Sequence, residues 1–142
     1  DNLDESFMIT TGEDLDIRLV EPVDWDNPVP REPVLQAWMK TTGPMPDQRG
    51  LHQAVLAYLS DAVLLDVCLI AHGRHFAHVG FQVASLDHAL WLHEDFRTDE
   101  WLLHTVEAER ICGGRGLARG SFYTQDGRLV ATTMQQGVMR FR

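Results

Sequence analysis

The stretch LHQAVLAYLSDAVLLDVCLIA, residues 51–71, is apolar over most of its length. Read as a helix it has no continuous polar face, and a helix of that kind is surrounded by the rest of its protein. Asp47 precedes it as a natural N-cap, and His72 and Gly73 follow it as a stop. We therefore predict one long buried helix around which the chain is organised.

Asp61 is the odd residue in this apolar run. None of the residues three or four positions away along a helix carries the opposite charge. A carboxylate on an apolar stripe must find hydrogen-bond partners, because its desolvation is otherwise costly. The alternative is that the helix stops near Ser60 and that Asp61 faces water in a turn. Spacing alone leaves both interpretations open.

Segments with period-two alternation lie on both sides of this helix. They are residues 15–20 and 34–42 before it, and 83–94, 101–112, 117–124 and 128–140 after it. We expect strands there, with a tight connection at Gly113 and Gly114 and a type I′ hairpin at Asp126 and Gly127. One buried helix among strands indicates an α+β fold, in which a curved antiparallel sheet wraps the helix.

Length and charge limit the possible functions. The chain of 142 residues is most simply one domain, which we place at residues 15–142 behind an acidic arm or linker at 1–14. Asp and Glu number 21 against 12 Lys and Arg, giving a net charge of −9. Broad electrostatic binding to nucleic acid or to an anionic membrane is therefore disfavoured, and we expect neither as a partner.

Only two cysteines, Cys68 and Cys112, are present. They are too few for a disulfide scaffold, so we expect a reducing, cytoplasmic location. The chain begins with Asp1. We therefore expect it to be a fragment or a processed product of a longer polypeptide.

Three histidines, His72, His75 and His78, lie within seven residues. Structural zinc sites usually add cysteines at short spacing, and the nearest sequence offers none. We expect a loop with solvated or capping histidines, and neither a metal nor a cofactor.

Ser85, Asp87 and His88 suggest a local catalytic triad. On a continuous strand, however, Ser85 and Asp87 share one face and His88 points to the other. His88 would then be unable to take the serine's proton, and the chain has no G-x-S-x-G elbow. A serine acyl-enzyme is therefore disfavoured.

Asp61, Ser85 and Gln135 form a different kind of set. A carboxylate, a hydroxyl and an amide that meet at one point can bind and orient a water, and the carboxylate can accept its proton. The sequence spacing does not show that the three meet.

Several segments resemble the C-terminal half of the acyl-CoA thioesterase II (TesB-like) family. They are LHQAVLAYLSD, VASLDHALWLHEDFRTDEWLL, RGLARGSFYTQDGRLVA and the ending QQGVMR, and the likeness runs from about Leu19 onward. The resemblance implies a hotdog fold, a curved antiparallel sheet around a long central helix. It also implies hydrolysis of acyl-CoA thioesters to CoA and a free fatty acid.

The family's site is an aspartate, a threonine or serine, and a glutamine that together bind the attacking water. These match Asp61 in AYLSD, Ser85 in VASLDH and Gln135 in MQQGVMR. The resemblance implies that Asp61 is the general base, with no covalent intermediate. Family members carry two hotdog units in one polypeptide, so we expect this unit to pair with a missing N-terminal half or with another copy.

Two rival functions stay open at this point. The unit can be a non-catalytic acyl-CoA-binding or scaffolding half that completes a partner's site. A related hotdog chemistry, such as hydration of an enoyl-CoA, is less favoured because His88 is predicted to face away from Ser85 and Asp87.

Overall fold

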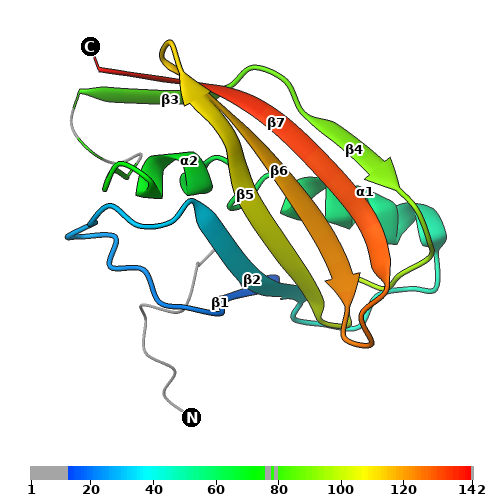
Figure 1. Cartoon of the computed structure of the whole chain (residues 1–142). Coiled ribbons are helices and arrows are strands. Elements are labelled where there is room, and N and C mark those ends of the chain that lie inside the picture. The colour runs from blue at the N-terminus through cyan, green and yellow to red at the C-terminus, as the bar shows by residue number, and fades with distance from the viewer. Residues whose placement is uncertain (1–12, 76–77, 79, 142) are drawn as a thin grey trace.

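Seven antiparallel strands form a single curved sheet (Figure 1). The computed structural model describes residues 13–75, 78 and 80–141. The strands are β1 (Leu15–Leu19), β2 (Val34–Thr41), β3 (Phe81–Ser85), β4 (Ala89–Leu92), β5 (Leu102–Cys112), β6 (Arg115–Thr124) and β7 (Leu129–Phe141). Their order is β1-β2-β5-β6-β7-β3, and β4 pairs with β7 as well. The predicted arm at 1–14 lies mostly outside the described residues.

There are two helices among the described residues, α1 (Arg49–Leu59) and α2 (Asp66–Ile70); in Figure 1, α1 lies behind β6 and β7, and α2 lies to the left of β5. The prediction of one helix over 51–71 is wrong, because α1 ends at Leu59 and residues 60–65 form turns. The predicted N-cap is also wrong. Gln48 takes that position, and the carboxylate of Asp47 instead accepts a hydrogen bond from Arg97 at 3.1 Å.

The apolar residues of both helices pack against alternate residues of the sheet. The buried helical and turn residues are Leu56, Leu59, Val63, Leu64, Val67, Cys68, Leu69 and Ile70; the sheet contributes Ile17, Leu19, Leu35, Ala37, Met39, Leu102, Val106, Ala118, Phe122, Val130, Ala131 and Met139. Burial of this apolar surface is the main force that holds the layers together. The α+β prediction is therefore confirmed, with a divided helix.

Strand β7 has three neighbours, and this arrangement builds the site. It pairs with β6 along its length, with β4 from Ala131 to Met134, and with β3 from Gly137 to Phe141. Residues 86–88 connect β3 to β4 outside any strand, opposite the middle of β7. The prediction of one strand over 83–94 is therefore wrong at its centre.

Two tight hairpins join the last three strands. Gly113 and Gly114 have φ of 58° and 71°, the positive values that a type I′ turn requires at both central positions. At the second hairpin only Gly127 has positive φ, at 88°, and its N–H donates to Thr124 O at 2.9 Å. This is a type I turn followed by a left-handed glycine. The hairpin prediction is confirmed, and its type I′ geometry is wrong.

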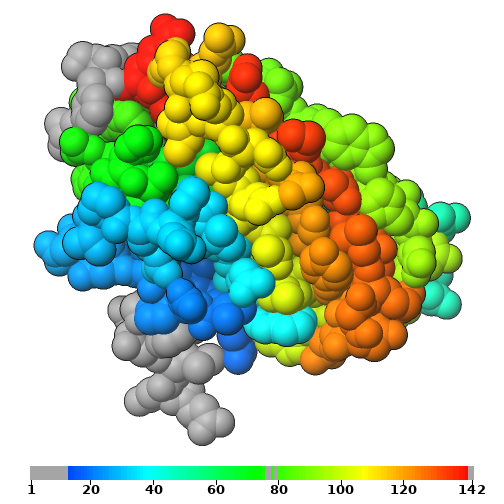
Figure 2. Space-filling model, in the orientation of Figure 1, coloured from blue at the N-terminus to red at the C-terminus, as the bar shows by residue number. Residues whose placement is uncertain are grey.

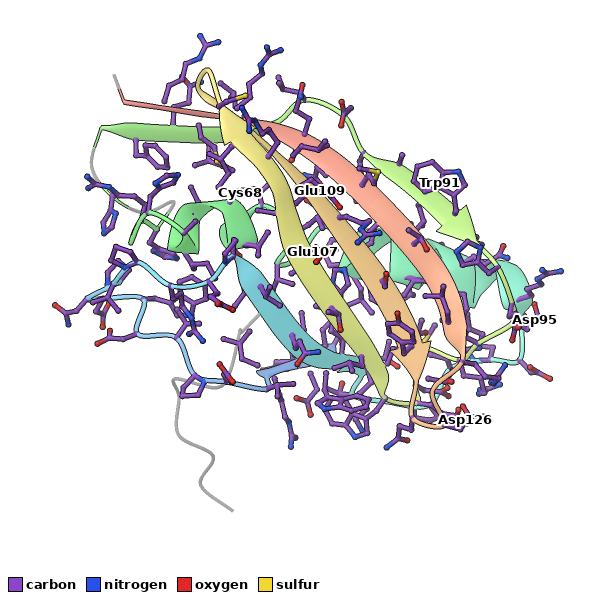
Figure 3. The ribbon with its side chains drawn as sticks, viewed as in Figure 1. Cys68, Trp91, Asp95, Glu107, Glu109 and Asp126 are labelled. Carbon is purple, nitrogen blue, oxygen red and sulfur yellow. The ribbon has the colours of Figure 1, made fainter. Side chains whose placement is uncertain are left out.

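The outer face of β5 to β7, coloured yellow to red, is turned to the viewer in Figure 2, beside the blue N-terminal segment. Glu107 and Glu109 lie on β5 (Figure 3), and both form ion pairs with Arg119 of β6. Because these side chains are exposed, each pair contributes little to stability. Within the described ranges, no helix is both long and apolar enough to cross a membrane.

Candidate active site

The amide of Gln135 lies at the centre of the site. Its side chain extends from β7 toward the helices and is fully buried. Nε2 donates one hydrogen bond to Asp61 Oδ1 at 2.8 Å and another to Ser85 Oγ at 2.5 Å. The structure therefore brings the three predicted residues together on one nitrogen atom.

Asp61 reaches the amide from the first turn after α1. The helix ends at Leu59, and the N–H of Asp61 bonds to Tyr58 O at 3.3 Å instead of continuing the helix. The alternative in which the helix stops near Ser60 and Asp61 is exposed in a turn is confirmed, and its carboxylate in addition has a buried hydrogen-bond partner. Its other oxygen, Oδ2, accepts no hydrogen bond from the residues that the structure describes.

Ser85 is the last residue of β3, where it pairs with Gly137 of β7. Its oxygen accepts from the Gln135 amide, so its own hydroxyl proton remains available for a ligand. The last pair of the β3–β7 ladder is Ser85 with Gly137, and Gly137 lies two residues after Gln135 on β7. The strand register therefore brings Ser85 close to Gln135.

His88 lies on the same side as Ser85, and the prediction that it faces away is wrong. Its Nδ1 is 2.5 Å from Gln135 Oε1, and its Nε2 is 2.8 Å from the hydroxyl of the buried Ser60. The reason is the break between β3 and β4. The Asp87 carboxylate accepts the Gln136 N–H at 2.8 Å, which ends the alternation on which the prediction depended.

Sequence reasoning thus missed His88 and Ser60 as neighbours of the site. One signal was present at Asp87, since aspartate is disfavoured within strands and favoured in turns. A break there removes the strict alternation between Ser85 and His88. No comparable local signal marks Ser60, whose contact comes from 28 residues away.

An open pocket of about 530 Å³ lies over the three residues. Its lining residues are Ala57, Tyr58, Asp61, Ala62, Ser85, Leu86, Asp87, His88 and Gln135. Tyr58 and Leu86 are 66% and 55% exposed at its rim. A polar centre under an apolar rim suits a ligand with a polar reacting group and an apolar tail.

A second carboxyl, that of Asp66, lies near the site at the start of α2. Burial, followed by the charge of Asp61, raises the pKa of Asp66 to about 6. The shift follows from desolvation and like-charge repulsion, both of which disfavour the ionised form. Asp61 therefore has a neighbouring carboxyl that is more readily protonated than an ordinary aspartate.

The three clustered histidines lie elsewhere. The His75 N–H donates to His78 Nδ1 at 3.1 Å, and the His75 ring is 5.1 Å from that of Trp25. Within the described part of the chain, no group of three or more His, Cys, Asp or Glu side chains has an arrangement that can hold a metal ion.

Comparison with known proteins identifies the family of the chain. The family model for acyl-CoA thioesterase matches residues 25–138. The chain belongs to the acyl-CoA thioesterase family. Acyl-CoA thioesterase 2 of Haemophilus influenzae is 42% identical over 105 residues, which cover 74% of this chain and 37% of that protein. Human acyl-coenzyme A thioesterase 8 is 34% identical over 130 residues, covering 90% of this chain and 40% of that protein.

Solved structures agree on the fold of this thioesterase-family chain. Acyl-CoA thioesterase II TesB2 from Mycobacterium marinum aligns with a TM-score of 0.78 and 35% identity, over all of this chain and 59% of that one. A hot dog fold protein from Alicyclobacillus acidocaldarius aligns with a TM-score of 0.69 at 21% identity, over 90% of this chain and 46% of that one. The hotdog fold is confirmed. The chain spans well under half the length of the curated relatives it matches.

Proposed function

We propose that this chain is one hotdog unit of an acyl-CoA thioesterase and hydrolyses acyl-CoA thioesters through Asp61, Ser85 and Gln135. One observation carries the proposal: a single amide nitrogen holds a carboxylate oxygen and a hydroxyl oxygen at 2.8 and 2.5 Å. A general base must lie within hydrogen-bond reach of the proton that it takes. Family membership supports acyl-CoA as the substrate class.

The reaction uses one water and no cofactor. The water donates one hydrogen to Asp61 Oδ2 and accepts the hydroxyl hydrogen of Ser85, which directs its lone pair at the thioester carbonyl. As the C–O bond forms, Asp61 takes the proton, and the carbonyl oxygen carries the negative charge of a tetrahedral intermediate. Collapse of the intermediate breaks the C–S bond. The CoA thiolate takes the proton from Asp61, which regenerates the carboxylate, and the acyl group leaves as the free acid.

We further propose that residues 15–142 form a single hotdog domain that pairs with a second unit, either an N-terminal sister unit or another copy. The pocket is open, and two apolar residues of the edge strand β4 beside it are exposed: Trp91 (labelled in Figure 3) to 51% and Leu92 to 39%. Exposed apolar side chains on an unpaired sheet edge favour association. The partner would close the pocket over the acyl chain.

The proposal is tested by free-thiol release from acyl-CoAs of graded chain length. The chain is assayed alone and together with the first hotdog unit that the family resemblance implies. Asp61→Asn keeps an oxygen that can accept from the Gln135 amide but cannot act as a base. We expect turnover to fall by about 100-fold or more, the scale of general-base loss.

Asp95→Asn is the matched control, because Asp95 is an exposed carboxylate that pairs with Arg49 away from the pocket. It should hydrolyse acyl-CoA at the unchanged rate. Near-normal turnover in Asp61→Asn would show the assignment of the base to be wrong. Absence of thiol release in both preparations would favour the alternative, a non-catalytic binding or scaffolding half.

A further inference from the structure

The ring of His88 bridges two side chains from different elements. Nδ1 lies 2.5 Å from Gln135 Oε1 of β7, and Nε2 lies 2.8 Å from Ser60 Oγ at the end of α1. The mechanism proposed above uses the nitrogen end of the Gln135 amide and assigns nothing to its oxygen end. His88 is the side chain that holds that oxygen.

The direction of each hydrogen bond follows from what the partners can donate. An ionised Asp61 carboxylate only accepts, so the atom of Gln135 that faces it must be the NH2 group. The carbonyl oxygen of the amide therefore faces His88. Because that oxygen also only accepts, His88 Nδ1 must carry a hydrogen.

The other ring nitrogen can adapt to its neighbours. Ser60 Oγ lies 2.8 Å from both His88 Nε2 and Ala57 O, and the hydroxyl has one proton to donate. With a neutral ring, Ser60 donates to Nε2. With a charged ring, Nε2 donates to Ser60, which donates to Ala57 O. Thr133 Oγ1, at 3.4 Å, is a more distant partner of the same nitrogen. In both states Nδ1–H stays directed at Gln135.

The anchor matters because both hydrogens of the amide nitrogen are already used. One goes to Asp61 and the other to Ser85. The water of the proposed mechanism binds Asp61 Oδ2 and the Ser85 hydroxyl hydrogen, so it depends on an amide that keeps both of these bonds. His88 holds the carbonyl end of that amide. Without a donor there, it can rotate and present its oxygen to the Asp61 carboxylate, which is repulsive.

We propose that His88 is a positioning residue, locked in the Nδ1–H form, that fixes the amide of Gln135 so that its nitrogen stays aimed at Asp61 and Ser85. The catalytic consequence rests on the proposed function. The locked ring form does not, because it follows from the hydrogen-bond chain alone.

The kinetic test compares two side chains of nearly equal size. His88→Asn keeps an N–H close to the Nδ1 position, whereas His88→Leu keeps the volume without the donor. We expect kcat to fall about 10- to 100-fold in His88→Leu, with KM changed by less than about threefold, because the loss is one of orientation. His88→Asn should recover most of kcat. Equal losses in both variants would overturn the proposal.

His93→Leu is the matched control. His93 is also hydrogen-bonded to β7, through Thr132 Oγ1 at 2.8 Å, but it does not line the pocket. Its kcat should equal that of the unmodified chain. A double-mutant cycle with Gln135→Ala then isolates the route of the effect. His88→Leu should cost nothing further in the Gln135→Ala background, and an undiminished loss there would overturn the proposal.

A spectroscopic test needs no activity. Long-range ¹H–¹⁵N correlations report which ring nitrogen of a histidine carries hydrogen, and loss of the signal in His88→Asn identifies His88. We expect Nδ1 to be protonated throughout the pH range in which the chain stays folded. A neutral ring protonated only at Nε2 would overturn the proposal. If the chain releases no thiol from acyl-CoA, the proposed function fails, and this measurement still decides the state of His88.

Discussion

Leu65 occupies the space that the missing side chain of Gly137 leaves on β7. A Cβ atom on Gly137 would lie 2.5 Å from Leu65 Cδ1. Leu65 ends the turn segment that carries Asp61, and Gly137 pairs with Ser85 in the sheet. This one close approach therefore sets the distance between the turn and the strands that supply the other two site residues.

Gly137→Ala should disturb this spacing. The methyl group forces Leu65 outward, at a cost of about 1–3 kcal/mol in the free energy of unfolding. Because Asp61 moves with Leu65, we expect acyl-CoA turnover to fall about tenfold or more. Thermal unfolding and steady-state kinetics check the two effects. In Gly50→Ala of α1 the new methyl group meets nothing within 4 Å, so this control should be at least as stable as the unmodified chain. Normal kinetics in Gly137→Ala would contradict the expectation.

The division of the helix could not be predicted from residues 51–71. Residues 62–65 are Ala, Val, Leu and Leu, which contain no glycine or proline to end a helix. The turn is stabilised by tertiary contacts that are remote in sequence. Asp61 meets Gln135 across 74 residues, and Leu65 fits against Gly137. The periodicity of the sequence predicts the strands, but it carries no information on these two contacts.

The prediction that Asp61, Ser85 and Gln135 meet depended on the family resemblance, because their spacing does not imply it. The resemblance did not predict the neighbouring residues His88 and Ser60. The prediction for His88 is wrong because strict strand alternation does not continue through Asp87. A single side chain that bonds to the neighbouring strand ends such a pattern.

Ser85 offers a prediction about the hydroxyl itself. Ser85→Thr keeps the oxygen that accepts from Gln135 and adds a methyl group at an exposed position, so turnover should stay within about threefold. Ser85→Ala removes the oxygen and leaves one amide hydrogen without a partner. We expect a loss of about 10- to 100-fold in turnover. The control, Ser121→Ala, lies on β6 outside the pocket lining and should have no effect. Equal rates for the alanine and threonine variants would remove the hydroxyl from the mechanism.

We expect the buried His104 to lower the free energy of unfolding in acid. Its ring is fully buried, stacks on Phe122 with centroids 3.9 Å apart, and has no hydrogen-bond partner among the described residues for either nitrogen. Burial, followed by the charge of His88, lowers the pKa of His104 from 6.5 to about 3. Between these values the unfolded chain binds a proton that the folded chain does not. The contribution of His104 to stability therefore falls as pH falls, by about 1.4 kcal/mol per pH unit.

His104→Phe should remove this contribution of His104 while keeping an aromatic ring against Phe122. Urea unfolding between pH 4 and 7.5 measures it. We expect the variant to gain stability over the unmodified chain as the pH is lowered from 6.5. The two buried nitrogens without partners also disappear, which favours the variant at neutral pH. An unchanged pH slope would show that His104 is protonated in the folded chain or reached by water.

Asp66 should act in the opposite direction over an overlapping range. Its pKa is raised from 3.8 to about 6, so between these values the folded chain holds a proton that the unfolded chain has released. Stability from this group is present at low pH and is lost as pH rises toward 6. Asp66→Asn should therefore be more stable than the unmodified chain at pH 7.5 and gain little below pH 4.

The two groups offset each other between about pH 4 and 6, where their slopes have opposite sign. The unmodified chain should then show a flat stability profile in that window. His104→Phe alone exposes the Asp66 slope, with stability decreasing as pH rises. Asp66→Asn alone exposes the His104 slope, with stability decreasing as pH falls. The double variant should be flat again and more stable than the unmodified chain at pH 7.5. Parallel profiles for the two single variants would contradict one of the two assignments, because a shared slope cannot come from pKa shifts of opposite sense.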